Sequence, residues 1–150
     1  MTIAFFGHGD FIKNKDVERK LTACLKDQVG DRDATLLCGG YGGFDAFVLE
    51  CGKQYRKMHR NTRIIFVTPY LPNEQKGREL MKQEYDEILY SGLENRPQRY
   101  AIIYRNRFMV EQADLVIVYL EHTWGGAYQA YEYAKRKGKV IINLALSRIV

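Results

Sequence analysis

Three clusters of glycine follow short apolar segments of the chain. They are Gly7-His8-Gly9, the run from Gly39 to Gly43, and Gly125-Gly126. Glycine lets a backbone approach a phosphate closely, and the amide groups at the start of a following helix can donate to it along a favourable dipole. None of the clusters fits GxGxxG or GxxxxGK[ST], which argues against a standard dinucleotide domain and against an ATPase. The alternative is that each cluster only makes a tight turn.

A second feature is the polar run Arg105-Asn106-Arg107 inside a segment of helical period. It interrupts the apolar stripe of residues 102–113, where packing favours apolar side chains. An arginine on an inward face is costly unless it is paired, and its planar fork suits a phosphate or a carboxylate. Arg105 is therefore predicted to anchor a phosphate, and the alternative is an internal salt bridge with Asp45 or Asp114.

The histidines and the single tryptophan add possible contacts to a ligand. His8, His59 and His122 show no metal-ligand spacing, so no metal and no cofactor are predicted. His8 could cap a phosphate or stack on a base. His122 and Trp124 are candidates for contacting a base or sugar, and the alternative for Trp124 is loop packing or a dimer contact.

The elements that must position these residues follow from the hydrophobic pattern. Apolar runs of strand length alternate with segments of helical period, as in stacked βαβ units. Strands are predicted at residues 3–6, 35–38, 63–67, 87–90, 115–119 and 140–144, with helices between them that include 74–83 and about 99–112, after a polar loop that ends at Pro97. The fold class is therefore α/β, a Rossmann-like, mostly parallel sheet with helices on both faces. All three glycine clusters would then lie at the carboxyl edge of the sheet, where ligands bind.

Length and composition indicate one globular domain over residues 1–150. The chain is 46% hydrophobic and 27% charged. Its apolar runs are far shorter than the roughly 20 residues of a membrane helix, and its start lacks a signal-peptide pattern, so a cytoplasmic location without membrane contact is expected. Cys24, Cys38 and Cys51 are predicted to be buried free thiols. The net charge of +5 favours anionic partners, but basic and acidic residues alternate, so nucleic acid is possible without being favoured.

Four segments together resemble the SLOG superfamily, which unites Rossmann-like proteins related to DprA and to the LOG cytokinin-activating enzymes. They are Phe6-Gly7-His8, Cys38 through Asp45, Arg105 through Val110, and Gly125 through Ala134. The likeness covers nearly the whole chain and is strongest to a small bacterial and phage branch with patterns such as TGHR, SGGALGFD and RNRYMVD. The chain departs from that branch at Gly9, at Tyr41-Gly42 and at Ala127, where the branch has arginine, a small apolar pair and threonine.

The resemblance implies a pocket for a nucleotide or a nucleotide derivative, built from the three glycine turns and the arginine helix. The residues predicted to bind the ligand are Gly7, His8, Gly39, Gly40, Gly42, Gly43, Asp45, Arg105, Asn106, Arg107, Trp124, Gly125 and Gly126. The resemblance also implies a homodimer or a higher oligomer. The 11 tyrosines, 7 phenylalanines and one tryptophan are consistent with an aromatic interface.

The LOG enzymes carry a PGGxGTxxE motif and an upstream arginine that belong to the cleavage of an N-glycosidic bond. By spacing, these positions fall on Glu132 and Arg105, which the resemblance implies as a catalytic pair. Here Trp124, Tyr128 and Gln129 replace the proline, the second glycine and the threonine of the motif.

Three functions follow in order of preference. The first is a binding or sensing domain for a nucleotide, with backbone donors in the second and third glycine clusters and Arg105 as anchor. The second is an N-glycosidic hydrolase of a nucleoside monophosphate. The third is a DprA-like protein that binds single-stranded nucleic acid.

Overall fold

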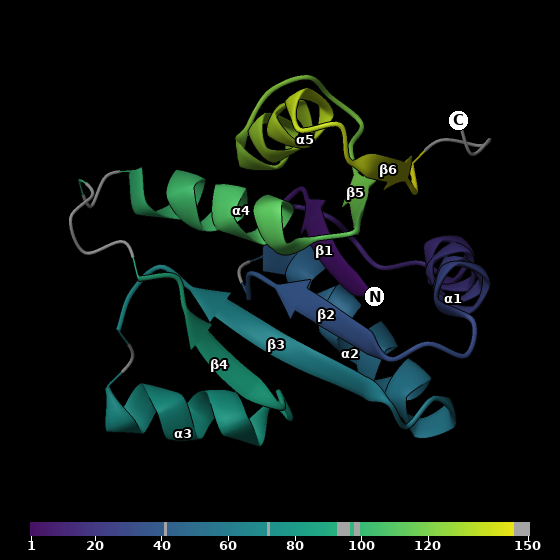
Figure 1. Ribbon diagram of the computed structural model, residues 1–150, viewed down its shortest axis with the longest axis horizontal. Coiled ribbons are helices and arrows are strands. Elements are labelled where there is room, and N and C mark those ends of the chain that lie inside the picture. The colour runs from purple at the N-terminus through teal and green to yellow at the C-terminus, as the bar shows by residue number, and fades with distance from the viewer. Residues whose placement is uncertain (41, 72, 93–96, 98–99, 146–150) are drawn as a thin grey trace.

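The computed structural model describes residues 1–40, 42–71, 73–92, 97 and 100–145. Within them, six parallel strands form one sheet in the order β4-β3-β2-β1-β5-β6 (Figure 1). The strands are β1 Thr2–Gly7, β2 Ala34–Cys38, β3 Thr62–Thr68, β4 Glu87–Tyr90, β5 Leu115–Tyr119 and β6 Val140–Asn143. The helices are α1 Lys15–Val29, α2 Gly42–Met58, α3 Glu74–Lys82, α4 Ala101–Gln112 and α5 Gly126–Arg136.

The predicted fold class is confirmed, and each predicted strand is present with its ends shifted by one residue or less. Helix α3 ends one residue before the predicted end. Helix α4 begins at Ala101; the predicted start near residue 99 and most of the predicted polar loop lie outside the described residues, as does Tyr41.

Helices cover both faces of the sheet because the strands are apolar on both sides. Ile3 and Phe5 of β1 point into a cluster with α1 and α2, while Ala4 and Phe6 point into a second cluster with α4 and α5. The alternation follows from the two-residue period of a strand. Figure 1 shows the same layers, with α4 and α5 in front of the sheet and α2 behind it.

The three cysteines are free and buried, as predicted, and all belong to the cluster on the α1 and α2 side. Burial raises the pKa of the Cys24 thiol to about 11 and that of the Cys51 thiol to about 12. Such thiols stay protonated and pack as small apolar groups.

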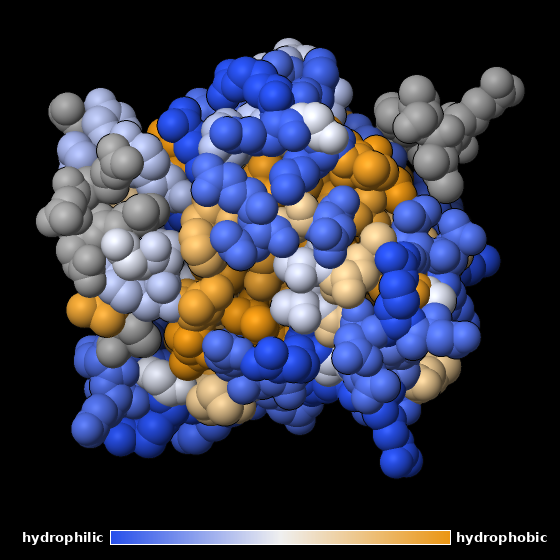
Figure 2. Space-filling model, viewed as in Figure 1, coloured by the Kyte–Doolittle hydropathy of each residue, from blue (hydrophilic) through white to orange (hydrophobic). Residues whose placement is uncertain are grey.

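The hydropathy of the face seen in Figure 1 varies from one part to another. Figure 2 shows hydrophilic residues over α5 and α3, and hydrophobic residues gathered below α4, over β3 and β4. Leu89 of β4 is only partly buried there. Helix α4 therefore covers the centre of this face more fully than its β4 edge.

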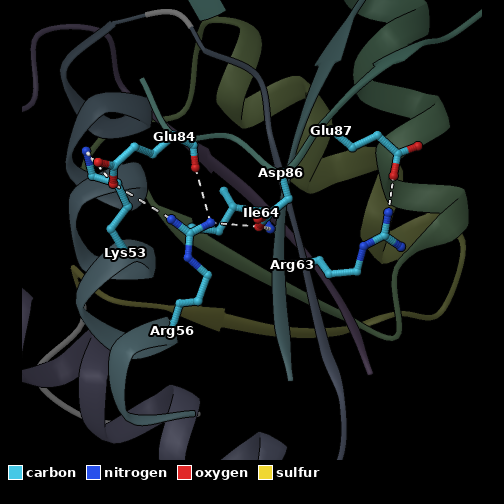
Figure 3. A network of polar contacts seen from close by, with 7 residues as sticks. All are labelled: Lys53, Arg56, Arg63, Ile64, Glu84, Asp86 and Glu87. Atoms are coloured by element: carbon cyan, nitrogen blue, oxygen red, sulfur yellow. Dashed lines mark hydrogen bonds and ion pairs between the residues drawn. The ribbon is translucent and has the colours of Figure 1, made fainter. Parts of the chain in front are cut away.

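A polar network fastens the edge strand β4 to α2 and β3 (Figure 3). The Arg56 guanidinium donates to the Asp86 carboxylate at 2.7 Å and to the Glu84 carbonyl at 3.1 Å. The same Asp86 oxygen accepts the Ile64 backbone N–H at 2.7 Å, and Arg63 pairs with Glu87 across the two strands. The network fixes the register between β3 and β4.

Candidate functional site

The sheet reverses its strand order between β1 and β5. Strands β2, β3 and β4 are added on one side of β1, and β5 and β6 on the other. Helices α1 and α2 pack on one face of the sheet and α4 and α5 on the opposite face. Open α/β sheets bind ligands at such a reversal, outside the carboxyl ends of the strands. A cavity of about 400 Å³ lies there, lined by residues that follow β1 and β5 and by one side of α4. We call it the first cavity.

Nine of the thirteen predicted ligand-binding residues line the first cavity. They are Gly7, His8, Gly39, Asp45, Arg105, Asn106, Trp124, Gly125 and Gly126. Each of the three glycine clusters contributes, as expected from the parallel sheet. Gly40, Gly42, Gly43 and Arg107 lie outside the cavity lining.

Packing explains Gly7 of the first cluster and Gly43 of the second. A Cβ on Gly7, the last residue of β1, would lie 2.2 Å from the Phe44 ring. A Cβ on Gly43 would lie 2.2 Å from the Phe11 carbonyl oxygen, and the Gly43 N–H donates to the Gly9 carbonyl at 2.9 Å. The expectation that Gly43 offers a free amide to a phosphate is therefore wrong, because the loop after β1 occupies that amide.

Gly40 and Gly42 are also set by packing. A Cβ on Gly40 would lie 1.7 Å from the Phe66 ring, and one on Gly42 would lie 2.8 Å from the Gly9 Cα. Both residues line a different cavity of about 270 Å³, on the α2 side, together with Tyr85. Among the described residues of the second cluster, only Gly39 lines the first cavity.

The third cluster is different, because no neighbouring atom requires its glycines. Nothing lies within 4 Å of a Cβ built on Gly125 or Gly126. Gly125 has φ +94°, a conformation that favours glycine. It precedes α5, whose N-terminus, like that of α4, has no side-chain cap, whereas Asn14 caps α1 and Asn73 caps α3. The first amides of a helix lack partners within the helix, so those of α5 are open to an anion at the cavity.

Arg105 lines the first cavity and is buried, with 4% of its surface exposed. Nη1 donates to the carbonyl oxygens of Gly39 and Val67, each at 3.0 Å, and Nε donates to Asn106 Oδ1 at 2.9 Å. At least three of its five N–H groups are thus used within the protein. The guanidinium joins the carboxyl ends of β2 and β3 and brings a positive charge to the cavity.

The alternative partner Asp114 lies at the opposite end of the sheet. Its carboxylate accepts the backbone N–H of Thr2, at the beginning of β1, at 2.8 Å. Asp45 lines the first cavity with Arg105.

The inward face of α4 is formed by Ala101, Arg105 and Met109, whereas Ile102, expected on that face, is 45% exposed.

Glu132 and Arg107 line a second cavity of about 360 Å³ between α4 and α5. Asn106 and Gly126 line both cavities, but Arg105 lines only the first. The Glu132 carboxylate lies 3.8 Å from Lys135 Nζ, and its interaction with the Tyr128 hydroxyl raises the pKa of that tyrosine. The structure therefore separates the two residues of the predicted catalytic pair into neighbouring cavities.

The Arg107 guanidinium lies near two aromatic rings, of which Tyr133 lines the second cavity. Its Cζ lies 5.2 Å from the centroid of the Tyr133 ring and 5.7 Å from that of Tyr104. Arg136 lies over the same Tyr133 ring at 5.7 Å. Such cation–π contacts hold arginines in place at a partly exposed surface.

His8 links the loop after β1 to the loop after β5 at the first cavity. Its Nε2 accepts the Glu121 backbone N–H at 3.0 Å, so the neutral ring carries its proton on Nδ1. Burial, reinforced by the neighbouring His122, lowers the pKa of His8. His8 stacks on His122, and His122 stacks on Trp124. Nδ1 of His122 is buried and has no hydrogen-bond partner among the described residues, a feature that is uncommon in folded proteins.

Several residues of the first cavity were not assigned to it from the sequence. They are Phe5, Phe6, Gly9, Asp10, Ile102, Met109 and Ala127. Gly9 belongs to the first glycine cluster and Asp10 directly follows it, so their position after a strand could have identified them. Ile102 and Met109 read as core residues of a helix, and no local signal distinguishes a cavity wall from a core.

The described residues contain neither a metal-binding cluster nor a membrane-spanning helix. No three histidine, cysteine or acidic side chains in this part of the chain group together as metal ligands. Within the same residues, no helix has the length and apolar character needed to cross a membrane.

No protein-family model matches the chain. A UPF0398 protein from Bacillus licheniformis is 25% identical over 145 residues, which cover 89% of this chain and 77% of the relative. The solved structure of DNA processing protein A (DprA) from Streptococcus pneumoniae aligns with a TM-score of 0.66 at 17% identity. DprA from Helicobacter pylori, which binds single-stranded DNA, aligns with 0.65 at 14%, and a molybdenum cofactor binding protein from Rippkaea orientalis with 0.59 at 18%.

These structures align over 95% of this chain, which spans only 49% of the first DprA, 64% of the second and 74% of the molybdenum cofactor binding protein. They confirm the Rossmann-like fold, and they agree with the predicted structural resemblance to DprA.

Proposed function

We propose that this protein binds a nucleotide or a nucleotide-derived molecule in the first cavity, with the phosphate at the start of α5. The observation that carries the proposal is the uncapped N-terminus of α5, which opens into a cavity at the point where the sheet reverses its order. Backbone amides and the helix dipole favour an anion there. Gly125 and Gly126 leave room for it, since no atom lies within 4 Å of their Cβ positions.

Arg105 lines the same cavity and adds a positive charge to it. Its charge is held at the cavity by carbonyl groups of β2 and β3 rather than by a flexible stem. A buried cation attracts a phosphate more strongly than an exposed one, because water screens it less. Arg105 thus acts by its fixed charge and by holding the strand ends in place.

The solved neighbours support a ligand of this class. One DprA binds single-stranded DNA and another neighbour binds a molybdenum cofactor. Their fold is shared with this chain, and the reversal point of the sheet is the place where this fold offers a site. A binding or sensing domain is the function that this site supports best.

Calorimetric titration of the purified protein with nucleoside monophosphates and with the matching nucleosides tests the proposal. We expect the monophosphates to bind and the nucleosides to bind at least tenfold more weakly, because the phosphate makes the contacts with α5. Nucleosides that bind as tightly as their monophosphates would refute the phosphate site. Native mass spectrometry of the freshly purified protein adds the mass of any retained molecule.

An N-glycosidic hydrolase is the second candidate. It is favoured by one observation, that the cavity lined by Glu132 meets the first cavity at Asn106 and Gly126. A ligand held by its phosphate at Gly126 could place its glycosidic bond toward Glu132, whose carboxylate could stabilise an oxocarbenium-like centre. Release of free base from a panel of monophosphates, abolished by Glu132→Gln, would establish this activity.

A DprA-like binder of single-stranded nucleic acid is the third candidate. Several phosphate contacts would give it an affinity that falls steeply with salt concentration, whereas a mononucleotide site responds weakly. The homodimer and the cytoplasmic location stay predictions, and sedimentation analysis tests the former.

A further inference from the structure

Three aromatic rings form a continuous stack beside the first cavity. The ring centroids of His8 and His122 lie 3.6 Å apart with planes inclined by 19°. Those of His122 and Trp124 lie 3.7 Å apart with planes inclined by 12°. All three side chains line the cavity. The rings are therefore nearly parallel and in contact, with His122 in the middle.

The stack is fixed at its inner end. His8 follows β1 and is 9% exposed, and its ring accepts the backbone N–H of Glu121, which follows β5. The stack thus bridges the two strands between which the sheet reverses its order. Because His8 is held in place and His122 and Trp124 stack on it in turn, the plane of the Trp124 indole is set by the fold.

The outer end of the stack is open. One face of the Trp124 indole lies on His122, yet Trp124 is 68% exposed, so its other face is accessible. Ile102, the other cavity residue with a large exposed apolar side chain, is 45% exposed. Exposed aromatic area beside a polar cavity is typical of a surface that binds a partner or ligand.

We propose that the accessible face of Trp124 is the stacking platform for the base of the bound nucleotide. The proposal rests on the function proposed above, because it takes the phosphate to lie at the start of α5. Trp124 is one residue before Gly125, so phosphate donors and platform are adjacent in the chain. Every base has a flat π-face, so a platform of this kind accepts purines and pyrimidines alike.

Trp124 is the chain's single tryptophan, so its fluorescence reports on the platform directly. The unmodified protein is titrated with AMP, UMP and ribose 5-phosphate, which has the phosphate and sugar but no base. Both nucleotides should quench the tryptophan emission and bind more tightly than ribose 5-phosphate. A short single-stranded oligonucleotide is titrated beside them; quenching by this strand alone would overturn the assignment to a free nucleotide.

Calorimetry of variants then separates stacking from other roles. Trp124→Ala should weaken AMP binding by about 5- to 150-fold and leave ribose 5-phosphate binding unchanged. Trp124→Phe should recover most of the affinity. The matched control is Met58→Ala, which removes an apolar side chain that is 66% exposed at the far end of α2, and should change neither affinity.

The results distinguish this proposal from the one on which it rests. If AMP and ribose 5-phosphate bind equally well and Trp124→Ala weakens neither, the phosphate site stands and the platform is wrong. If neither compound binds, both proposals fail. If Trp124→Ala changes the oligomeric state while the affinity for AMP stays the same, Trp124 is an interface residue and the platform is overturned.

Discussion

A single substitution at the start of α5 should move folding stability and ligand affinity in opposite directions. Gly126→Asp places a carboxylate at the first residue of the helix, where nothing lies within 4 Å of the new Cβ. A negative side chain in the first turn stabilises a helix by about 0.3 to 1 kcal/mol through the dipole. The folded protein should therefore tolerate the aspartate and become slightly more stable.

The same carboxylate should weaken nucleotide binding because it occupies the place proposed for the phosphate. Two unit charges about 4 Å apart repel by about 1 kcal/mol in water and about 4 kcal/mol at an effective dielectric constant of 20. A phosphate monoester carries a charge of about −1.5 to −2, and the partly open cavity lies between these limits. We take the repulsion between the carboxylate and the phosphate as about 1.4 to 2.8 kcal/mol, which corresponds to a loss of affinity of about 10- to 100-fold.

The assay compares the unmodified protein, Gly126→Asp and Gly126→Ala. Urea unfolding gives the free energy of unfolding, and calorimetric titration with one nucleoside monophosphate gives the affinity. Gly126→Ala is the matched control, since it adds a Cβ without charge and should keep the affinity within about threefold. If the aspartate variant binds the nucleotide as well as the alanine variant does, the phosphate does not lie at the start of α5.

Three further changes test the neighbouring contacts. Arg105→Met should lower the free energy of unfolding by about 2 to 5 kcal/mol, measured by urea unfolding, because two buried carbonyl groups lose their donor. Burial lowers the pKa of His8 below its ordinary value of 6.5, so the unfolded chain binds the proton first as the pH falls. The free energy of unfolding therefore keeps its full His8 contribution above about pH 6.5 and declines below that pH. His8→Gln should lessen this decline. Arg56→Met should lower the free energy of unfolding by about 1 kcal/mol, because it removes the partly exposed ion pair with Asp86. Arg19→Met, which removes an ion pair on the exposed surface, should leave that free energy almost unchanged. Thermal unfolding measures both effects.

The layers of the fold were predictable because the central strands β1 and β5 are apolar on both faces. A run such as Ile3 to Phe6 has no polar side to turn to water, which already requires helices on both sides of a parallel sheet. The order of strands was not predictable from such runs. It depends on which edges pair, and the apolar pattern of β5 fits beside β1 no better than beside β4.

The three glycine clusters lie at the carboxyl edge of the sheet, as the pattern predicted, but the pattern did not show why glycine is needed at each position. Gly7 and Gly43 have no Cβ because Phe44 and the Phe11 carbonyl occupy that space, and the sequence gives no sign of those neighbours. Arg105 and Glu132 have the spacing of a catalytic pair along the chain, but spacing fixes only the position along each helix. The rotation of α4 and α5 on the sheet turns the two side chains into different cavities.

The proposal that the phosphate lies at the start of α5 rests on a comparison of three of the helix starts at this edge of the sheet. In standard dinucleotide-binding folds the first strand-to-helix turn holds the phosphate. Here α1 begins at Lys15, and its first turn is capped by Asn14, whose side chain accepts the Val17 N–H at 3.0 Å. The start of α2 is closed by the bond from the Gly43 N–H to Gly9. The start of α5 has neither a side-chain cap nor a neighbour over its glycines, so of the three it is the one that can accept a phosphate without breaking a contact of the folded chain.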